Sequence, residues 1–321
     1  MMYNLTKLTL FLSIFTVYAL NAQQQGFGLV KSMEVISTSG NHTPDFNSSS
    51  VFDGIPIMGK KADKHNNTYS LPFGAGFHAI YFDQKYLASN LFLSSDSTIL
   101  TARADTLYQN TSAYEMKGTI RPNVWVFPFL NIYGTFGYTK GLISPKLVIP
   151  SVTIENIPII NTLAVDSTFE INDEIGYVGP TYGIGATISF GYKFMFFMID
   201  YNYSITNPSD FDENLESHFF SPKAGLFLGK ETSEMFGALW LGAMYINNDQ
   251  TFYGKVDVVD IDPAFIPFFG EEANYSGKLS AIQRWNIILG GSIIINQQHH
   301  ILVELGFFDR KQITIGYDFR F

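Results

Sequence analysis

Charged residues occupy alternate positions in one stretch of the chain, which is how a β-strand places side chains on a single face. Between Ala113 and Phe127, Glu115, Lys117 and Arg121 share one parity, and mostly apolar residues share the other. Enclosed ionisable groups either pair with one another or mark a route for an ion or substrate. By the same parity reasoning we expect one polar row to contain Glu115, Lys117, Arg121, Asp200, Lys223, Arg284, Glu304, Asp318 and Arg320.

Hydrolytic chemistry would need a nucleophile beside a base, or two paired carboxylates. His78 and His218 are the candidate bases, and His218 lies near several acidic residues. Neither sits in a local motif of the outer-membrane proteases, phospholipases or deacylases, so we assign no catalytic residue. His299 and His300 are adjacent, and adjacent strand residues point apart, so we expect no shared metal. The chain has no cysteine, which excludes thiolate chemistry and disulfides.

Acidic residues cluster in three connecting segments. Their carboxylates could hold a divalent cation or attract a cationic solute, or they could simply be solvated. No cofactor is indicated. The clusters are Asp166, Glu170, Asp173 and Glu174; Asp210, Asp212, Glu213 and Glu216; and Asp257, Asp260, Asp262, Glu271 and Glu272.

Alternating segments that could position the polar row recur from residue 71 to the last residue. We predict ten strands of about 9–12 residues, the length that a tilted strand needs to cross the hydrocarbon layer. Placing Lys117 or Arg121 toward lipid would cost about 2–4 kcal/mol each, so the charged parity must face a lumen. The expected strands are 71–82, 113–127, 132–142, 181–192, 194–205, 219–229, 236–247, 285–295 and a closing pair within 301–321.

The connections between these strands alternate between short and long. Short turns are expected at 128–131, 193, 230–235 and 296–299, and long external loops at 83–112, 143–180, 206–218 and 248–284. This alternation is typical of a transmembrane antiparallel up-and-down β-barrel, all-β, with about ten strands or alternatively twelve. Residues 309–311 form an unusually short external connection, and strand-like residues 147–165 could form an external hairpin.

The chain ends on an amphipathic strand. Ile313, Ile315, Tyr317, Phe319 and Phe321 share one parity, and polar residues or glycine share the other. This ending resembles the closing-strand signal of Gram-negative outer-membrane β-barrels, here Tyr317, Phe319 and Phe321, and over residues 71–321 the chain looks like a barrel of the Bacteroidota type. The resemblance implies an outer-membrane location, contact with outer-membrane lipid, and insertion by the barrel-insertion machinery.

Composition supports a strand-rich membrane protein. The chain is 46% hydrophobic and 15% charged, and its net charge of −9 argues against nucleic acid as a partner. Lys7 and the apolar stretch 8–20 predict a signal peptide at 1–22. Residues 23–70 would be a periplasmic or plug segment, and residues 71–321 the barrel.

Two local features refine the barrel interpretation. Pro122 would interrupt a ladder bond, which predicts a bulge there. A secreted β-sandwich would also alternate, but it would not need aromatic girdles near the strand ends. The expected girdle residues are Trp125, Trp285, Tyr182, Tyr192, Tyr201, Tyr317 and Phe319.

The sequence therefore predicts a non-enzymatic, porin-like barrel that supports the envelope or passes a small solute through a polar lumen. Loop-mediated surface binding or adhesion is the first alternative. An outer-membrane hydrolase, a lipase or a protease using His218, is the second.

Overall fold

The computed structural model describes most of the chain after residue 70. The described residues are 57, 71–94, 101–105, 108–109, 111–149, 151–157, 161–165, 169–172, 174–192, 194–209, 213–229, 234–261, 263 and 266–321. The predicted signal peptide lies outside the described residues, and so does the predicted segment 23–70 except Ile57. The Ile57 amide donates to the Val126 carbonyl at 2.8 Å, which places Ile57 beside the end of the second barrel strand.

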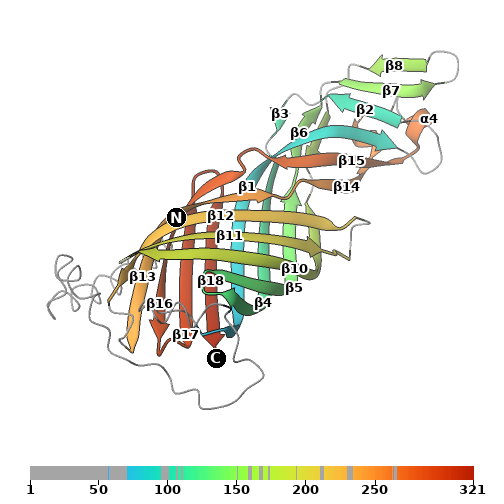
Figure 1. The fold of residues 1–321 in the computed structure, drawn as a ribbon. Coiled ribbons are helices and arrows are strands. Elements are labelled where there is room, and N and C mark those ends of the chain that lie inside the picture. Colours follow the sequence, from blue (N-terminus) through green and yellow to red (C-terminus); the bar gives the residue numbers. More distant parts are fainter. Residues whose placement is uncertain are drawn as a thin grey trace, which may run out of the picture.

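Ten antiparallel strands close into a barrel, as the sequence predicted, rather than the alternative twelve (Figure 1). Every predicted strand segment corresponds to one of them. Their order around the barrel is β1 (Phe73–Ser94), β4 (Thr111–Phe127), β5 (Leu130–Ser144), β10 (Ile175–Tyr192), β11 (Met195–Thr206), β12 (Leu215–Leu228), β13 (Met235–Asn247), β16 (Trp285–Ile295), β17 (His299–Phe307) and β18 (Lys311–Arg320).

The last strand closes the barrel against the first. β18 pairs with β1 from Gly74↔Arg320 to Asp83↔Lys311. Beyond this ladder, the Phe73 and Phe321 backbones exchange two hydrogen bonds of 3.2 and 2.9 Å, and their rings stack with centroids 6.2 Å apart. The C-terminus lies at the end of the barrel that carries the short turns (Figure 1), which is the periplasmic end in this class. The terminal Phe thus completes the ladder and leaves no free edge there.

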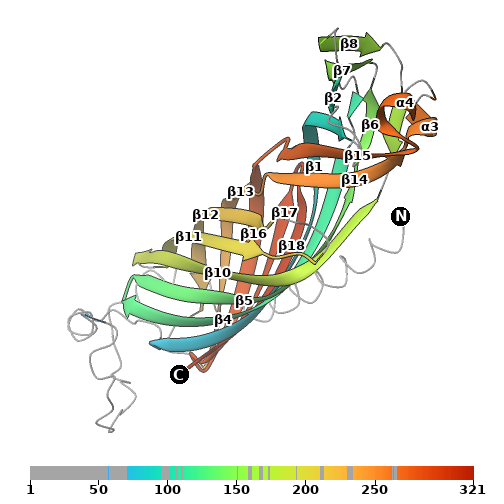
Figure 2. The same ribbon diagram turned by 90° about the vertical axis from the view of Figure 1, so that its right-hand side faces the viewer.

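Strand β1 continues past the barrel rim, and this part of the fold was not predicted. Its distal half pairs with β15 (Glu272–Ala281) on one side and β2 (Thr101–Asp105) on the other. The predicted long connections are present, but they are folded into strands beyond the barrel (Figure 2). These external sheets also contain β3 (Tyr108–Gln109), β6 (Lys146–Ile149), β7 (Ser151–Ile157), β8 (Asn161–Val165), β9 (Phe169–Asn172) and β14 (Gln250–Asp257), with two short helices, α3 (Val258–Ile261) and α4 (Ile266–Phe269).

The external sheets have a hydrophobic core of their own. Tyr86, Leu147, Phe252, Phe269 and Leu279 belong to one buried cluster, and each is at most 2% exposed. The cluster reaches down to inward residues at the external ends of β4, β5, β10 and β12. The core therefore lies over the external mouth of the barrel and joins the two parts of the molecule.

The predicted bulge at Pro122 is wrong. The β4–β5 register is the same before and after Pro122, with Ile120↔Phe136 and Asn123↔Tyr133. It shifts instead between Trp125 and Phe127. Pro122 lacks an N–H and so leaves a gap in the ladder, but no extra residue is inserted there. The real bulge lies nearer the periplasmic end of the strand.

Side chains alternate between the two faces of the barrel wall. Outward residues such as Phe77, Phe136 and Ile184 are 55–60% exposed. Tyr182, Tyr192, Tyr201, Trp285, Tyr317 and Phe319 are exposed as the girdle interpretation requires. Trp125 is the exception, because its parity places its ring inside the barrel, beside Arg320. No helix in the described ranges is long and apolar enough to cross a membrane.

Candidate functional site: the polar lumen

Residues predicted for the polar row, with the exception of Arg284, lie inside the barrel. On β4, Glu115 and Lys117 are 8% and 5% exposed, whereas their outward neighbour Met116 is 62% exposed. The strand is amphipathic because lipid surrounds the wall and the lumen holds the polar groups. The enclosed charges then need partners, since an isolated buried charge is strongly unfavourable.

Glu115 is the centre of the first group of contacts. Tyr177 on β10 donates its hydroxyl to Glu115 Oε2 at 2.9 Å, and Lys117 Nζ lies 3.4 Å from Oε1. Lys117 also lies 5.2 Å from the ring centroid of Phe219 on β12. Strand β12 is four places from β4 in the closed order. Side chains from distant walls therefore meet in this lumen.

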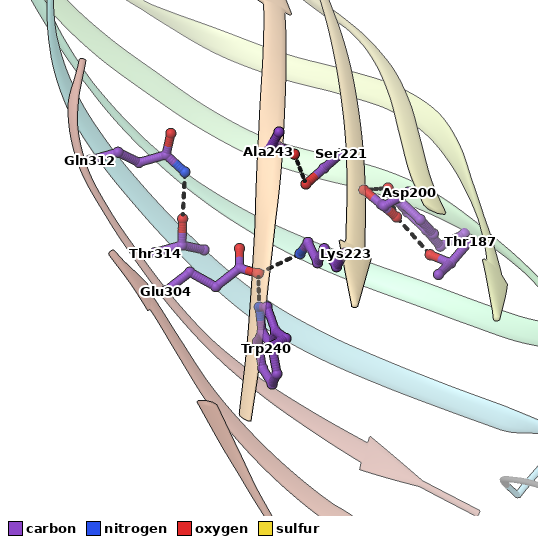
Figure 3. Close-up of polar contacts among 10 residues, drawn as sticks. Thr187, Asp200, Ser221, Lys223, Trp240, Ala243, Glu304, Gln312 and Thr314 are labelled. Atoms are coloured by element: carbon purple, nitrogen blue, oxygen red, sulfur yellow. Dashed lines mark hydrogen bonds and ion pairs between the residues drawn. The ribbon is translucent and has the colours of Figure 1, made fainter. Parts of the chain in front are cut away.

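A second group joins Lys223, Glu304 and Trp240. Both the Lys223 ammonium and the Trp240 indole N–H, the latter at 2.8 Å, donate to Glu304 Oε1 (Figure 3). The sequence left the faces of β13 unassigned. The structure places Trp240 in the lumen and Leu239 and Leu241 toward lipid. Each of these two opposite charges therefore has its partner inside the barrel.

A third group surrounds Asp200 on β11. Tyr133 donates its hydroxyl to both Asp200 oxygens at 3.0 and 3.1 Å, and Thr187 donates to Oδ1 at 2.6 Å. The Arg121 guanidinium lies 5.2 Å from the Tyr133 ring centroid. Asp200 is therefore held by two hydroxyls, and among the described residues it forms no ion pair.

The fourth group lies at the periplasmic end. His78 Nε2 is 3.2 Å from the Asp318 carboxylate, which joins the first strand to the last. The Arg320 guanidinium lies 5.5 Å from the centroid of the Trp125 ring, and Arg320 Nη1 donates to the Leu71 carbonyl at 3.3 Å. The predicted row members Asp318 and Arg320 thus face the lumen.

The external end of the lumen is closed by side chains. Tyr86 on β1 accepts a hydrogen bond from Asn248 Nδ2 at 2.7 Å, and Asn248 follows β13. Arg310, from the short β17–β18 turn, is 1% exposed and donates to the Met244 carbonyl at 2.9 Å and to Gln312 Oε1 at 3.2 Å. Among the described residues Arg310 forms no ion pair. Burial lowers the pKa of its guanidinium to about 10.

Arg284 does not belong to the polar row, so the sequence placed it wrongly. It precedes β16, at the external rim, and its Nη2 contacts Asp249 at 2.9 Å while Nη1 donates to the Tyr245 hydroxyl at 3.2 Å. The hydrogen bond to Tyr245 and the Asp249 charge raise the pKa of Arg284. Strand parity failed here because Arg284 lies just outside the strand that it was assigned to.

The remaining candidate histidines do not form a catalytic set. His218 faces outward, where Nδ1 is 2.9 Å from the Tyr201 hydroxyl and its ring lies 4.8 Å from that of Tyr203. His299 contacts the Tyr317 hydroxyl at 2.8 Å, whereas His300 contacts the Gln297 carbonyl at 3.2 Å. The two adjacent rings thus have different partners.

The acidic clusters can be assessed only in part. Asp166, Asp173, Asp210, Asp212 and Asp262 lie outside the described residues. Within the described ranges, no group of three acidic or histidine side chains is arranged to hold a metal ion. Glu272 instead pairs with Lys255 at 3.0 Å on the exposed surface of the external sheets.

Several lumen residues that sequence reasoning missed are aromatic, and each lies over a glycine of the next strand. A Cβ added to Gly290 would lie 2.3 Å from the Trp240 ring, and one added to Gly185 would lie 2.3 Å from the Tyr133 ring. Trp240↔Gly290 and Tyr133↔Gly185 are direct cross-strand pairs. An inward aromatic opposite an inward glycine is thus the signal that could have located these residues. Arg310 gave no comparable signal, because it lies in a turn.

One shallow cavity of about 480 Å³ lies in the wall formed by β4, β5 and β10. Pro122, Gly134 and Phe136 line it from the lipid-facing side, next to the gap that Pro122 leaves in the ladder. Its lining is largely apolar and contains no charged residue, although Asn123 and Tyr133 from the lumen parity also contribute to it.

Comparison with known proteins agrees with this architecture. The family model for an outer membrane protein beta-barrel domain matches residues 8–226, more than half of the chain. The chain matches no curated protein.

Three solved structures are similar at low identity. The β domain of the Bordetella autotransporter Brka is 9% identical, with 77% of this chain and 100% of that one covered and a TM-score of 0.29. The transport unit of the Escherichia coli autotransporter AIDA-I is 9% identical, with 78% and 90% covered and a TM-score of 0.28. The Ralstonia pickettii toluene transporter TbuX is 8% identical, with 79% and 90% covered and a TM-score of 0.28. By its family match, the chain belongs to the outer membrane protein β-barrel domain family and is located in a Gram-negative outer membrane.

Proposed function

We propose that this protein is a non-enzymatic outer-membrane barrel that passes a small polar solute through its lumen. The observation that carries the proposal is the enclosed polar row, which runs from Arg320 at the periplasmic end to Gln84 and Gln312 at the external end. Ionisable groups kept at membrane depth usually mark a solute or proton path, because they are costly to place there.

The closed external end makes the proposed passage gated. Arg310 and the Tyr86–Asn248 hydrogen bond would have to move before a solute could pass. In this proposal the Arg310 side chain is the group that moves, because it comes from a turn and its hydrogen-bond partners are neutral acceptors rather than carboxylates.

Conductance of the purified protein in planar bilayers tests this proposal. We expect the unmodified protein to be mostly closed and Arg310→Ala to raise the open fraction at least several-fold. Lys311→Ala is the matched control, because Lys311 is the next residue but is exposed. If both variants are as silent as the unmodified protein, and vesicles take up no solute, solute passage is excluded and an envelope-supporting barrel remains.

A second candidate function is surface binding through the external sheets. The observation that favours it is their independent core, together with the terminal strand β8, one of whose edges is unpaired in the described sheet. A free strand edge can pair with a strand of another molecule. We expect replacement of residues 151–165 by a short Gly-Ser linker to reduce aggregation of cells that display the protein, without loss of barrel folding. Unchanged aggregation would count against this function.

A hydrolase is the least supported alternative. His218 faces outward between two tyrosines, and its Nδ1 contacts a hydroxyl that belongs to Tyr201. We therefore expect His218→Ala to leave any lipase or protease activity of the purified protein unchanged. A Bacteroidota origin, contact with the insertion machinery and a divalent cation at the acidic segments stay predictions from the sequence.

A further inference from the structure

Buried N–H donors without an acceptor gather at the periplasmic end of the lumen. They are Arg121 Nε, Trp125 Nε1 and Arg320 Nε, none of which has a hydrogen-bond partner among the described residues. A buried donor that lacks an acceptor is unfavourable, so each such group needs a physical explanation. A ligand that supplies acceptor oxygens would provide one.

The three residues lie on neighbouring strands. Trp125 and Arg121 are on β4 and Arg320 is on β18, with β1 between them. Arg320 is paired across the ladder with Gly74, and Gly74 is paired on its other side with Asn123. The Arg320 guanidinium nevertheless reaches the Trp125 ring on β4, with its central carbon 5.5 Å from the ring centroid.

Both arginines carry charge that no carboxylate of the described residues contacts directly. Arg121 and Arg320 take part in none of the ion pairs among the described residues. Asp318, the acid nearest to Arg320 along the chain, is in contact with His78 at 3.2 Å. Arg320 is 8% exposed, so its charge is also largely shielded from water.

Toward the external end of the lumen, the buried atoms without a hydrogen-bond partner among the described residues are of other kinds. They are the side-chain oxygens of Asn247, Asn248 and Asn286, which accept, the hydroxyls of Thr111 and Ser204, which can donate or accept, and Glu115 Oε1, which has Lys117 Nζ at 3.4 Å. The N–H donors without an acceptor are therefore found at the periplasmic end.

We propose that Arg121, Trp125 and Arg320 bind a small oxyanion, a carboxylate or phosphate group that enters from the periplasmic side. Charged guanidinium groups form strong hydrogen bonds with such oxygens. The source is a free solute rather than a lipid headgroup, because the three side chains face the lumen and lipid contacts the other face. This inference deepens the proposed function by naming its solute class.

Equilibrium titration of the full-length protein in an uncharged detergent tests the site. Succinate and inorganic phosphate are the probes, with sodium chloride of equal ionic strength as the reference, and calorimetry is the readout. We expect saturable binding of at least one probe. Arg121→Gln should weaken binding of the probe at least tenfold. Trp125→Phe should weaken it at least threefold.

Lys255→Gln is the matched control, because it removes an exposed cation from the external sheets. It should bind as the unmodified protein does, and every variant should retain heat-modifiable migration, which shows a folded barrel. Absence of saturable binding, or unchanged binding by Arg121→Gln, would overturn the proposal. Displacement of the probe by added phosphatidylglycerol would contradict the statement that the ligand is a free solute and not a lipid headgroup. Because binding is measured without a membrane, a failure of passage in bilayers leaves this result unaffected.

Discussion

Strand β1 runs through both the barrel and the external sheets, but the side chains on its inward face differ between the two parts. In the barrel, the even-numbered residues of β1 face the lumen, and they include the polar His78 and Gln84 beside the apolar Phe82. Past the rim, the same parity carries Tyr86 and Ala88, which are 1% exposed in the hydrophobic core. The backbone is equivalent in both parts, so the surroundings decide which face must be apolar.

The difference has a clear physical origin. Around the barrel, lipid covers the outer face and the lumen encloses polar groups. Beyond the rim, water covers the outer face, so apolar side chains are stabilised by packing against each other inside. The inward positions of β1 thus become consistently apolar from Tyr86 onward, after the polar Gln84 and the apolar Phe82.

The largest effect should come from the core of the external sheets. Phe252 is 0% exposed and its ring packs against Tyr275 at a centroid distance of 6.0 Å. We expect Phe252→Ala to cost about 3–5 kcal/mol because it creates a cavity in a packed core. Hydrogen exchange should show faster exchange in β14 and β15, while the ten-stranded barrel stays protected. Equal loss of protection in both parts would show that they fold as one unit.

The second test places the same charge on an outward position of each part. Ile120 is 59% exposed on the lipid-facing wall and Val259 is 58% exposed on α3. Ile120→Lys should destabilise the barrel by about 2–4 kcal/mol, because an ammonium would meet hydrocarbon. Val259→Lys should change stability by less than about 0.5 kcal/mol, as water already surrounds that site. Denaturant unfolding in lipid vesicles measures both free-energy changes. Similar changes for the two variants would refute the conclusion that lipid surrounds the barrel wall while water surrounds the external sheets.

The two parts also differ in how well they could be predicted from the sequence. All ten barrel strands were predicted, because alternation on two chemically different faces gives a strong period-2 signal. Residues 83–94 and 272–281 were interpreted as loop. Their apolar residues pack into a core shared by several short strands, and no single short segment of this kind carries an unambiguous period.

The sequence indicated which residues belong to the candidate site, but it did not indicate which of them contact one another. Parity indicated an inward position for Glu115, Lys223 and Glu304, and their side chains lie inside the barrel. It could not identify which distant strand supplies each partner, because pairing across the lumen depends on barrel curvature and side-chain length. Arg284 was placed wrongly and Arg310 was missed for one shared reason, since both lie outside regular strands, where parity has no meaning.

The third test compares one ion pair from each part. Glu304 is 3% exposed and accepts from both Lys223 and Trp240, whereas the side chains of Glu272 and Lys255 are 60% and 62% exposed. We expect Glu304→Gln to cost about 2–3 kcal/mol, because a hydrogen bond to a charged group is lost and Lys223 keeps a buried charge. Glu272→Gln should cost less than about 1 kcal/mol. Urea unfolding of matched samples compares the two, and equal costs would mean that water reaches Glu304 freely.

The smallest effect concerns the close approach of aromatic rings to glycines inside the barrel. A Cβ at Gly290 would lie 2.3 Å from the Trp240 ring, whereas one at Gly118, on the outer face, would meet nothing within 4 Å. Gly290→Ala should therefore cost about 1–3 kcal/mol, since the ring must move in a packed interior, and it should shift the fluorescence of Trp240 as its N–H leaves Glu304. Gly118→Ala is the control and should change neither quantity. If Gly290→Ala leaves both the stability and the emission spectrum unchanged, the lumen has enough free space for the ring to move, and the paired aromatic groups do not fix its shape.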